Sequence, residues 1–173
     1  MDSRKRNLTI AAKHGCYLLT LFFAYVLQTV PGLFSIGGIK PVLLVPLAIT
    51  IAAFEGEFVG ALYGMLAGLL WEIAAGRTIG GFSILLLALC FVCGVSVALY
   101  LRRTVLNLSL LSAGCLLLLC SSDFIFSYWL QGYSGIAGVY FLRMLPTVCY
   151  SAALTFFYFH LVRRISAVFA LRD

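Results

Sequence analysis

Long apolar runs, separated by short polar or glycine-rich stretches, organise this chain. The runs cover about residues 15–34, 41–54, 58–75, 79–101, 105–131 and 139–162. A helix needs about 20 apolar residues to cross the hydrocarbon core of a bilayer, and every run except the second approaches or exceeds that length. The pattern predicts an all-α protein, with a single integral membrane domain over residues 1–173 that forms a bundle of six transmembrane helices.

The second run, Pro41 to Phe54, is short, and Pro46 inside it favours a kink because proline removes a backbone hydrogen bond. The distribution of cations indicates whether this run spans the membrane. Six spans keep most Lys and Arg residues on one side, whereas five spans would export the cations that follow the fourth and last runs. Because cytoplasmic segments carry the excess of Lys and Arg, we expect six spans with both termini in the cytoplasm. The cytoplasmic cations are then Arg4, Lys5, Arg6, Lys13, Arg102, Arg103, Arg163, Arg164 and Arg172.

Glycines recur at every fourth residue through the third run, and the same register continues to an acidic residue and two further glycines. On an α-helix, residues four apart form a slanting stripe along one side. A stripe without side chains lets a second helix approach closely, which favours helix association in lipid. The stripe is either an interface with a partner or a packing surface inside one bundle. Its members are Gly56, Gly60, Gly64, Gly68, Glu72, Gly76 and Gly80.

The composition excludes several classes of function. Hydrophobic residues make up 63% of the 173-residue chain, charged residues 10%, and the mean hydropathy is +1.08. The formal net charge is +6, but the cations flank apolar runs as orientation signals do, so we expect no nucleic-acid binding. The sequence shows no metal-ligand spacing, no phosphate-binding loop and no catalytic triad pattern. We therefore expect a protein that is not an enzyme and holds no cofactor or metal.

Three charged residues fall inside the apolar runs, where insertion of each costs roughly 2.5–3.5 kcal/mol at a helix centre. They are Glu72, Asp123 and Arg143. With six spans, all three lie in the outer half of the bilayer, close enough in depth to pair. Our hypothesis is that Arg143 bridges Glu72 or Asp123; the alternative is that each side chain reaches water at its own helix end.

The chain resembles the MreD family, the rod-shape-determining membrane proteins of bacteria. The resemblance rests on the length, the six apolar runs, the stretch GALYGMLAGLLWEIAAGRTIGGFSILLLAL and the terminal stretch MLPTVCYSAALTFFYFHLVRRI. In the family, a glycine-spaced helix closes in GLL-x-Asp and is followed by a Leu-Gly pair; here an acid is retained as glutamate, and Ile79 replaces the leucine. The matching residues are Gly64, Gly68, Leu69, Leu70, Glu72, Gly80, Pro146 and Tyr150.

The resemblance implies a non-enzymatic scaffold of the cell-wall elongation machinery in the bacterial cytoplasmic membrane. Such a protein binds the bitopic protein MreC and, through that complex, helps couple the MreB filament to the wall polymerase and transpeptidase. The family is also similar in fold to the six-helix substrate-binding subunits of energy-coupling-factor vitamin transporters. The alternative function is therefore a vitamin-binding subunit, whose polar and aromatic pocket would use Asp123, Tyr128, Trp129 and Arg143.

Overall fold

The computed structural model describes residues 3–30, 39–76, 80–124 and 144–170. These residues form six α-helices, and five of the helices are long and apolar enough to cross a membrane. This confirms the all-α membrane bundle that the apolar runs predict. The helices are α1 (Ser3–Thr29), α2 (Leu44–Glu55), α3 (Glu57–Ala75), α4 (Gly81–Leu99), α5 (Val105–Phe124) and α7 (Leu145–Ala170).

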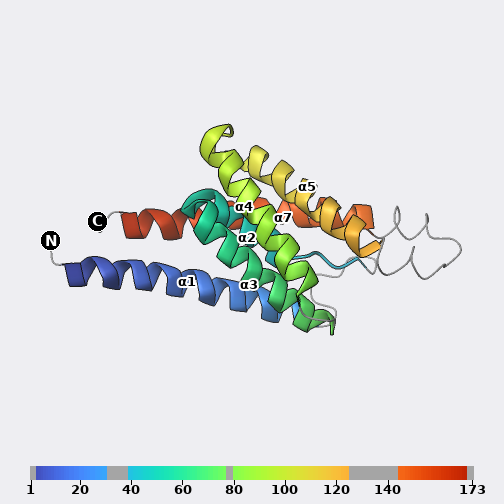
Figure 1. The fold of residues 1–173 in the computed structure, drawn as a ribbon, viewed down its shortest axis with the longest axis horizontal. Helices are drawn as coiled ribbons and strands as arrows, with labels where there is room; N and C mark the ends of the chain where they lie inside the picture. The colour runs from blue at the N-terminus through green and yellow to red at the C-terminus, as the bar shows by residue number, and fades with distance from the viewer. Residues whose placement is uncertain (1–2, 31–38, 77–79, 125–143, 171–173) are drawn as a thin grey trace, which may run out of the picture.

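The short helix α2 completes the path of the chain through the bundle. Both termini lie at the same end of the molecule, which we call the terminal end (Figure 1). Five long helices alone would leave the termini at opposite ends. The described helices therefore pass along the bundle six times, with α2 and the residues before it making the second pass. With 12 residues, α2 is about 18 Å long, which is shorter than the roughly 30 Å hydrocarbon core of a bilayer.

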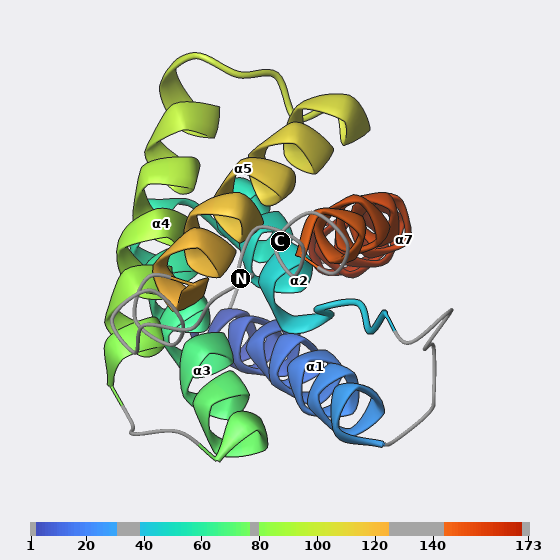
Figure 2. The same cartoon turned by 90° about the vertical axis from the view of Figure 1, so that its right-hand side faces the viewer.

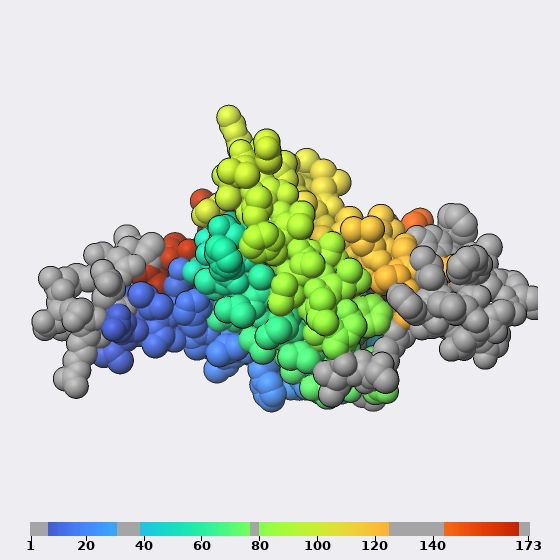
Figure 3. All heavy atoms as spheres, in the orientation of Figure 1, coloured from blue at the N-terminus to red at the C-terminus, as the bar shows by residue number. Residues whose placement is uncertain are grey.

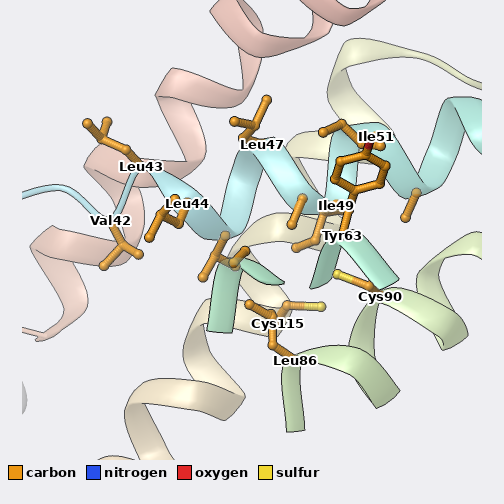
Figure 4. Close-up of a cluster of buried hydrophobic side chains, with 14 of the residues drawn as sticks. Val42, Leu43, Leu44, Leu47, Ile49, Ile51, Tyr63, Leu86, Cys90 and Cys115 are labelled. Atoms are coloured by element: carbon orange, nitrogen blue, oxygen red, sulfur yellow. The ribbon is translucent and has the colours of Figure 1, made fainter. Parts of the chain in front are cut away.

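Helix α2 lies at the centre of the bundle, and the other five helices surround it (Figure 2). Every residue from Leu44 to Ala53 is buried. A helix that is apolar on all sides is suited to such a position because no face of it needs water. Figure 4 shows Leu44, Leu47 and Ile49 of α2 packed among side chains of the neighbouring helices. The hydrophobic core is therefore built around the apolar run that is least like a membrane span.

Several boundaries differ from the sequence-based expectation. Helix α1 begins at Ser3 rather than near residue 15, and α7 continues to Ala170 rather than ending near residue 162. Charged residues are compatible with a helix that extends past the apolar layer, so apolar length underestimates both helices. The expected kink at Pro46 is wrong: α2 begins at Leu44, so the proline lies in the first helical turn, where its missing N–H is not needed.

The glycine stripe packs inside the bundle. Figure 3 shows α3 and α4 side by side on one face, and the close approach is at Gly64 and Gly68 of α3. A methyl group built on Gly68 would lie only 2.6 Å from Cα of Ser83, and one on Gly64 would lie 2.8 Å from the carbonyl oxygen of Leu86. Gly60 faces Ala52 of α2 in the same way. The stripe is thus occupied by helices of its own chain.

Gly56 and Gly80 do not take part in this packing. A methyl group built on either would meet no atom within 4 Å. Their φ angles are +93° and +125°, which belong to the region that favours glycine, and each glycine forms the turn that precedes a helix. The glycine stripe therefore contains two kinds of glycine. Those in the middle allow close helix packing, and those at its two ends form turns.

We predict that Gly68→Ala lowers the free energy of unfolding by about 1–3 kcal/mol, because the added methyl group forces the α3 and α4 backbones apart. The matched control is Gly114→Ala in α5, where no atom lies within 4 Å of the added methyl group. The control should be neutral or slightly stabilising, since alanine favours helix over glycine by about 1 kcal/mol. Thermal unfolding in detergent measures both; equal midpoints for the two variants would contradict the packing described.

Candidate functional site

Glu72 in the last turn of α3 holds the beginning of α4. Its side chain is 1% exposed. Oε1 accepts a hydrogen bond from the backbone N–H of Phe82 at 2.6 Å and a longer one from Ser83 at 3.4 Å. Oε2 accepts from the N–H of Gly80 at 2.8 Å and from the Ser83 hydroxyl at 2.5 Å. The carboxylate thus satisfies backbone donors at the start of α4 that have no partner within the helix.

This geometry explains why a carboxylate is tolerated in an apolar helix. Hydrogen bonds to the charged form, together with the positive end of the α4 dipole, offset the loss of hydration.

Of the two charged residues that the sequence analysis grouped with Glu72, the structure describes one. Asp123 lines the same small pocket as Glu72. Arg143 lies outside the described residues, and its pairing stays a prediction.

The pocket beside Glu72 lies at the end of the bundle opposite the termini. Its described lining is Trp71, Glu72, Ala75, Phe82 and Asp123. The Trp71 and Phe82 rings are 5.6 Å apart between centroids. The cavity volume is about 70 Å³, which is well below the roughly 300–1,000 Å³ typical of sites for drug-sized ligands. Tyr128 and Trp129, which the vitamin-binding alternative also invoked, lie outside the described residues.

A second polar arrangement holds the residues that lead into α2. These residues enter the bundle without helical structure, so their N–H groups need partners other than water. The N–H of Val42 donates to Oγ of Ser151 in α7 at 2.8 Å. Oε1 of Gln28 in α1 accepts from the N–H groups of Leu43 and Leu44 at 2.8 and 3.2 Å. Two side chains from neighbouring helices therefore satisfy three backbone donors.

A third polar arrangement lies at the other end of α2. Glu55, its last residue, forms a 2.7 Å ion pair with Lys13 and accepts a 2.8 Å hydrogen bond from the Tyr17 hydroxyl. His14 stacks on the ring of Tyr63 from α3, and its Nδ1 lies 3.2 Å from the tyrosine hydroxyl. This polar cluster comprises Lys13, His14, Tyr17, Glu55 and Tyr63. It joins α1, α2 and α3 at the terminal end.

Together the second and third arrangements fasten α1 to both ends of α2. Tyr17 and Gln28 are 11 positions apart on α1, or about 16 Å along a helix axis. That distance is close to the length of α2, which runs in the opposite direction. Sequence analysis did not identify these residues as a set. The available signal was their polarity: Gln28 is an amide inside an apolar run, and Glu55 follows another.

The remaining motif residues have structural positions. Leu70 packs against the hydrophobic core, Leu69 and Tyr150 are half-buried, and Pro146 lies in the first turn of α7.

Sγ of Cys93 in α4 lies 3.4 Å from Sγ of Cys115 in α5, and both cysteines are buried. Within the described residues, no group of three or more His, Cys, Asp or Glu side chains is placed to hold a metal ion.

Comparison with protein-family models, curated proteins and solved structures finds no match for this chain. The case for a function therefore comes from the residues and their geometry.

We predict that Glu72→Gln destabilises the protein by roughly 2–4 kcal/mol. The amide offers one acceptor oxygen in place of two, and its NH₂ group faces N–H donors, so at least one buried donor loses its partner. Thermal unfolding in detergent at pH 7 measures the change. Glu57→Gln, in the first turn of α3, is the control and should change the midpoint little, because Glu57 is only half-buried. Similar midpoints for both variants would contradict the capping role of Glu72.

We also predict that two variants near residues 39–43, the segment leading into α2 that we call the lead-in, differ in how far they destabilise the protein. Gln28→Leu removes the acceptor of two N–H groups, whereas Ser151→Ala removes the acceptor of one. Gln28→Leu should therefore lower the free energy of unfolding more than Ser151→Ala does. Each buried donor left without a partner costs about 1–3 kcal/mol. Thr29→Val is the control, because the Thr29 hydroxyl is exposed and bonds only the carbonyl of Tyr25 in its own helix. Chemical denaturation in mixed micelles measures the free energy of unfolding. If Gln28→Leu and Thr29→Val gave the same value, the proposed hydrogen bonds from Gln28 to the lead-in would be refuted.

Proposed function

We propose that this protein is a non-enzymatic membrane scaffold of the MreD type, which binds MreC within the cell-wall elongation machinery. The observation that carries the proposal is the position of Glu72. The acid that follows GLL in the resemblance accepts four hydrogen bonds from the start of the next helix. The acid of the GLL-x-acid pattern therefore has a structural role, since it joins the end of α3 to the start of α4. A rigid connection of this kind suits a scaffold that presents fixed surfaces.

The use of the other polar groups supports the same proposal. Gln28 and Ser151 hold the lead-in to α2, and Glu55 is paired with Lys13 and Tyr17. These side chains stabilise the fold and form no catalytic arrangement with one another. The outward faces of the helices are strongly apolar, as lipid or a partner helix requires.

The proposal includes a membrane orientation. The lead-in and α2 make the second of six crossings, so both termini face the cytoplasm, in agreement with the positive-inside rule. The bitopic helix of MreC would then pack on an outward face, because the glycine stripe is already occupied. We propose the face of α1, whose span is the least buried of the five. Phe22 and Phe23 on that face are 61% and 60% exposed.

We expect affinity purification through a tag on the C-terminus, at native expression level, to recover MreC together with wall-synthesis enzymes. Mass spectrometry should cover both proteins and small molecules. Recovery of paired ATPases with a bound vitamin would instead contradict the scaffold and support the transporter subunit. A preparation that contains neither set of partners would also count against the proposal.

A pair of variants tests the choice of α1. Phe22→Ala combined with Phe23→Ala should lower MreC recovery several-fold, because large apolar side chains dominate helix contacts. The control combines Ile84→Ala with Phe91→Ala on the outward face of α4, where the side chains are 68% and 37% exposed. Loss of MreC only with the control pair would move the interface to α4.

A further inference from the structure

Four exposed arginines lie at the terminal end of the bundle. Arg102 and Arg103 are in the turn between α4 and α5, and Arg163 and Arg164 are in the last part of α7. The guanidinium of Arg103 lies 5.8 Å from the centroid of the Phe54 ring, a cation–π arrangement that directs the side chain over the end of α2. The two pairs come from segments far apart in the sequence.

Aromatic contacts connect Arg103 of the first pair with the side of α7 that carries Arg163. The Phe54 ring lies 5.6 Å from the ring of Phe159 in α7. Arg163 is four residues after Phe159, so it lies on the same side of α7 one turn nearer the terminal end. Arg103 and Arg163 therefore border one region, where Phe54 and Phe159 lie between them.

The turn that carries the first pair has a defined conformation. The carbonyl oxygen of Arg102 accepts hydrogen bonds from the N–H of Thr104 at 2.8 Å and from Nδ2 of Asn107 at 3.0 Å. The Thr104 hydroxyl also lies 3.5 Å from the backbone N of Asn107, at the beginning of α5. These bonds fix the turn that carries Arg102 and Arg103 relative to the beginning of α5.

In the part of the chain that the structure describes, few acids lie near the four arginines. Among the described residues, none of the four lies within ion-pair distance of a carboxylate. Glu55 is already paired with Lys13, and Glu72 and Asp123 border the pocket at the opposite end. Glu57, at the start of α3, is the other described acid of the terminal end. The region therefore has an excess of positive charge and fits an anion.

The depth of the region indicates what kind of anion. Arg163 follows the start of α7 by about 27 Å of helix, close to the thickness of a hydrocarbon core. Phe156 and Phe157, one to two turns before the arginine pair, are both 61% exposed. Arginines at the edge of an apolar layer, with exposed aromatic rings below them, match the phosphate and the acyl chains of one phospholipid. A soluble acidic peptide would leave the aromatic rings uncovered.

We propose that the region between the α4–α5 turn and the end of α7 binds the headgroup of an anionic phospholipid, with Arg103 and Arg163 contacting its phosphate and Arg102 and Arg164 adding positive charge nearby. The proposal does not depend on the scaffold function. It assigns these arginines a binding role beyond setting the orientation of the chain in the membrane.

The test uses the full chain purified in a neutral detergent and titrated with phosphatidylglycerol or phosphatidylcholine. Native mass spectrometry measures the lipid retained, and thermal unfolding measures the stabilisation. Phosphatidylglycerol should be retained in preference and should raise the midpoint more than phosphatidylcholine does. Either double variant, Arg163→Gln with Arg164→Gln or Arg102→Gln with Arg103→Gln, should weaken retention about tenfold or more.

Lys40→Gln is the matched control, because Lys40 is exposed and its Nζ lies 3.5 Å from the carbonyl oxygen of Val30, just after the end of α1. Its loss should leave retention unchanged, and all variants should remain folded when no lipid is added. Equal retention of the two lipids, or equal weakening by Lys40→Gln, would overturn the proposal. So would variants that keep phosphatidylglycerol but lose an acidic protein partner, since the region would then be a protein interface.

Discussion

A buried chain segment without helical structure must obtain its hydrogen bonds from side chains, and this constraint organises the bundle. In a bilayer, each backbone N–H without a partner costs several kcal/mol. The residues that lead into α2 meet the constraint through Gln28 and Ser151, which accept from the N–H groups of residues 42–44. Because these acceptors come from α1 and α7, the two terminal helices are fixed by the way the central helix begins.

The same principle operates at two other positions. Glu72 accepts from the first N–H groups of α4, and Glu55 at the end of α2 joins Lys13 and Tyr17 of α1. In each case a polar side chain fixes the end of one helix to another helix, while apolar contacts and close-packing glycines hold the middle. A bundle fixed in this way presents outward surfaces of constant shape, which is the property that the proposed scaffold function requires.

The sequence predicted the long helices well because their apolar runs approach or exceed the length that a helix needs to cross a bilayer. The third run, expected over residues 58–75, forms α3 at Glu57–Ala75. The ends of α1 and α7 were less predictable, since charged residues continue a helix beyond the apolar layer. The short α2 was expected to be a span with a kink. Its position at the centre depends on how five other helices pack, which no local pattern encodes.

The polar positions were predictable by type but not by partner. Glu72 was identified as an acid inside the membrane, and Arg143 was expected to bridge it or Asp123; that pairing stays a prediction, since Arg143 lies outside the described residues. Among the described residues, the partners of Glu72 are backbone N–H groups and one hydroxyl, and backbone donors leave no sequence signal. The glycine stripe was also recognised, but the choice between a partner and its own bundle required the distances from Gly64 and Gly68 to α4.

Amide hydrogen exchange at Val42, Leu43 and Leu44, measured by NMR on the protein in detergent, tests this account most directly. The account predicts strong protection of all three amides, comparable with that in the interior of α2, because each donates to a side chain inside the bundle. Exchange at the rate of an unstructured peptide would show that the segment is open to water. The claim that these side-chain acceptors hold the centre of the bundle would then be wrong.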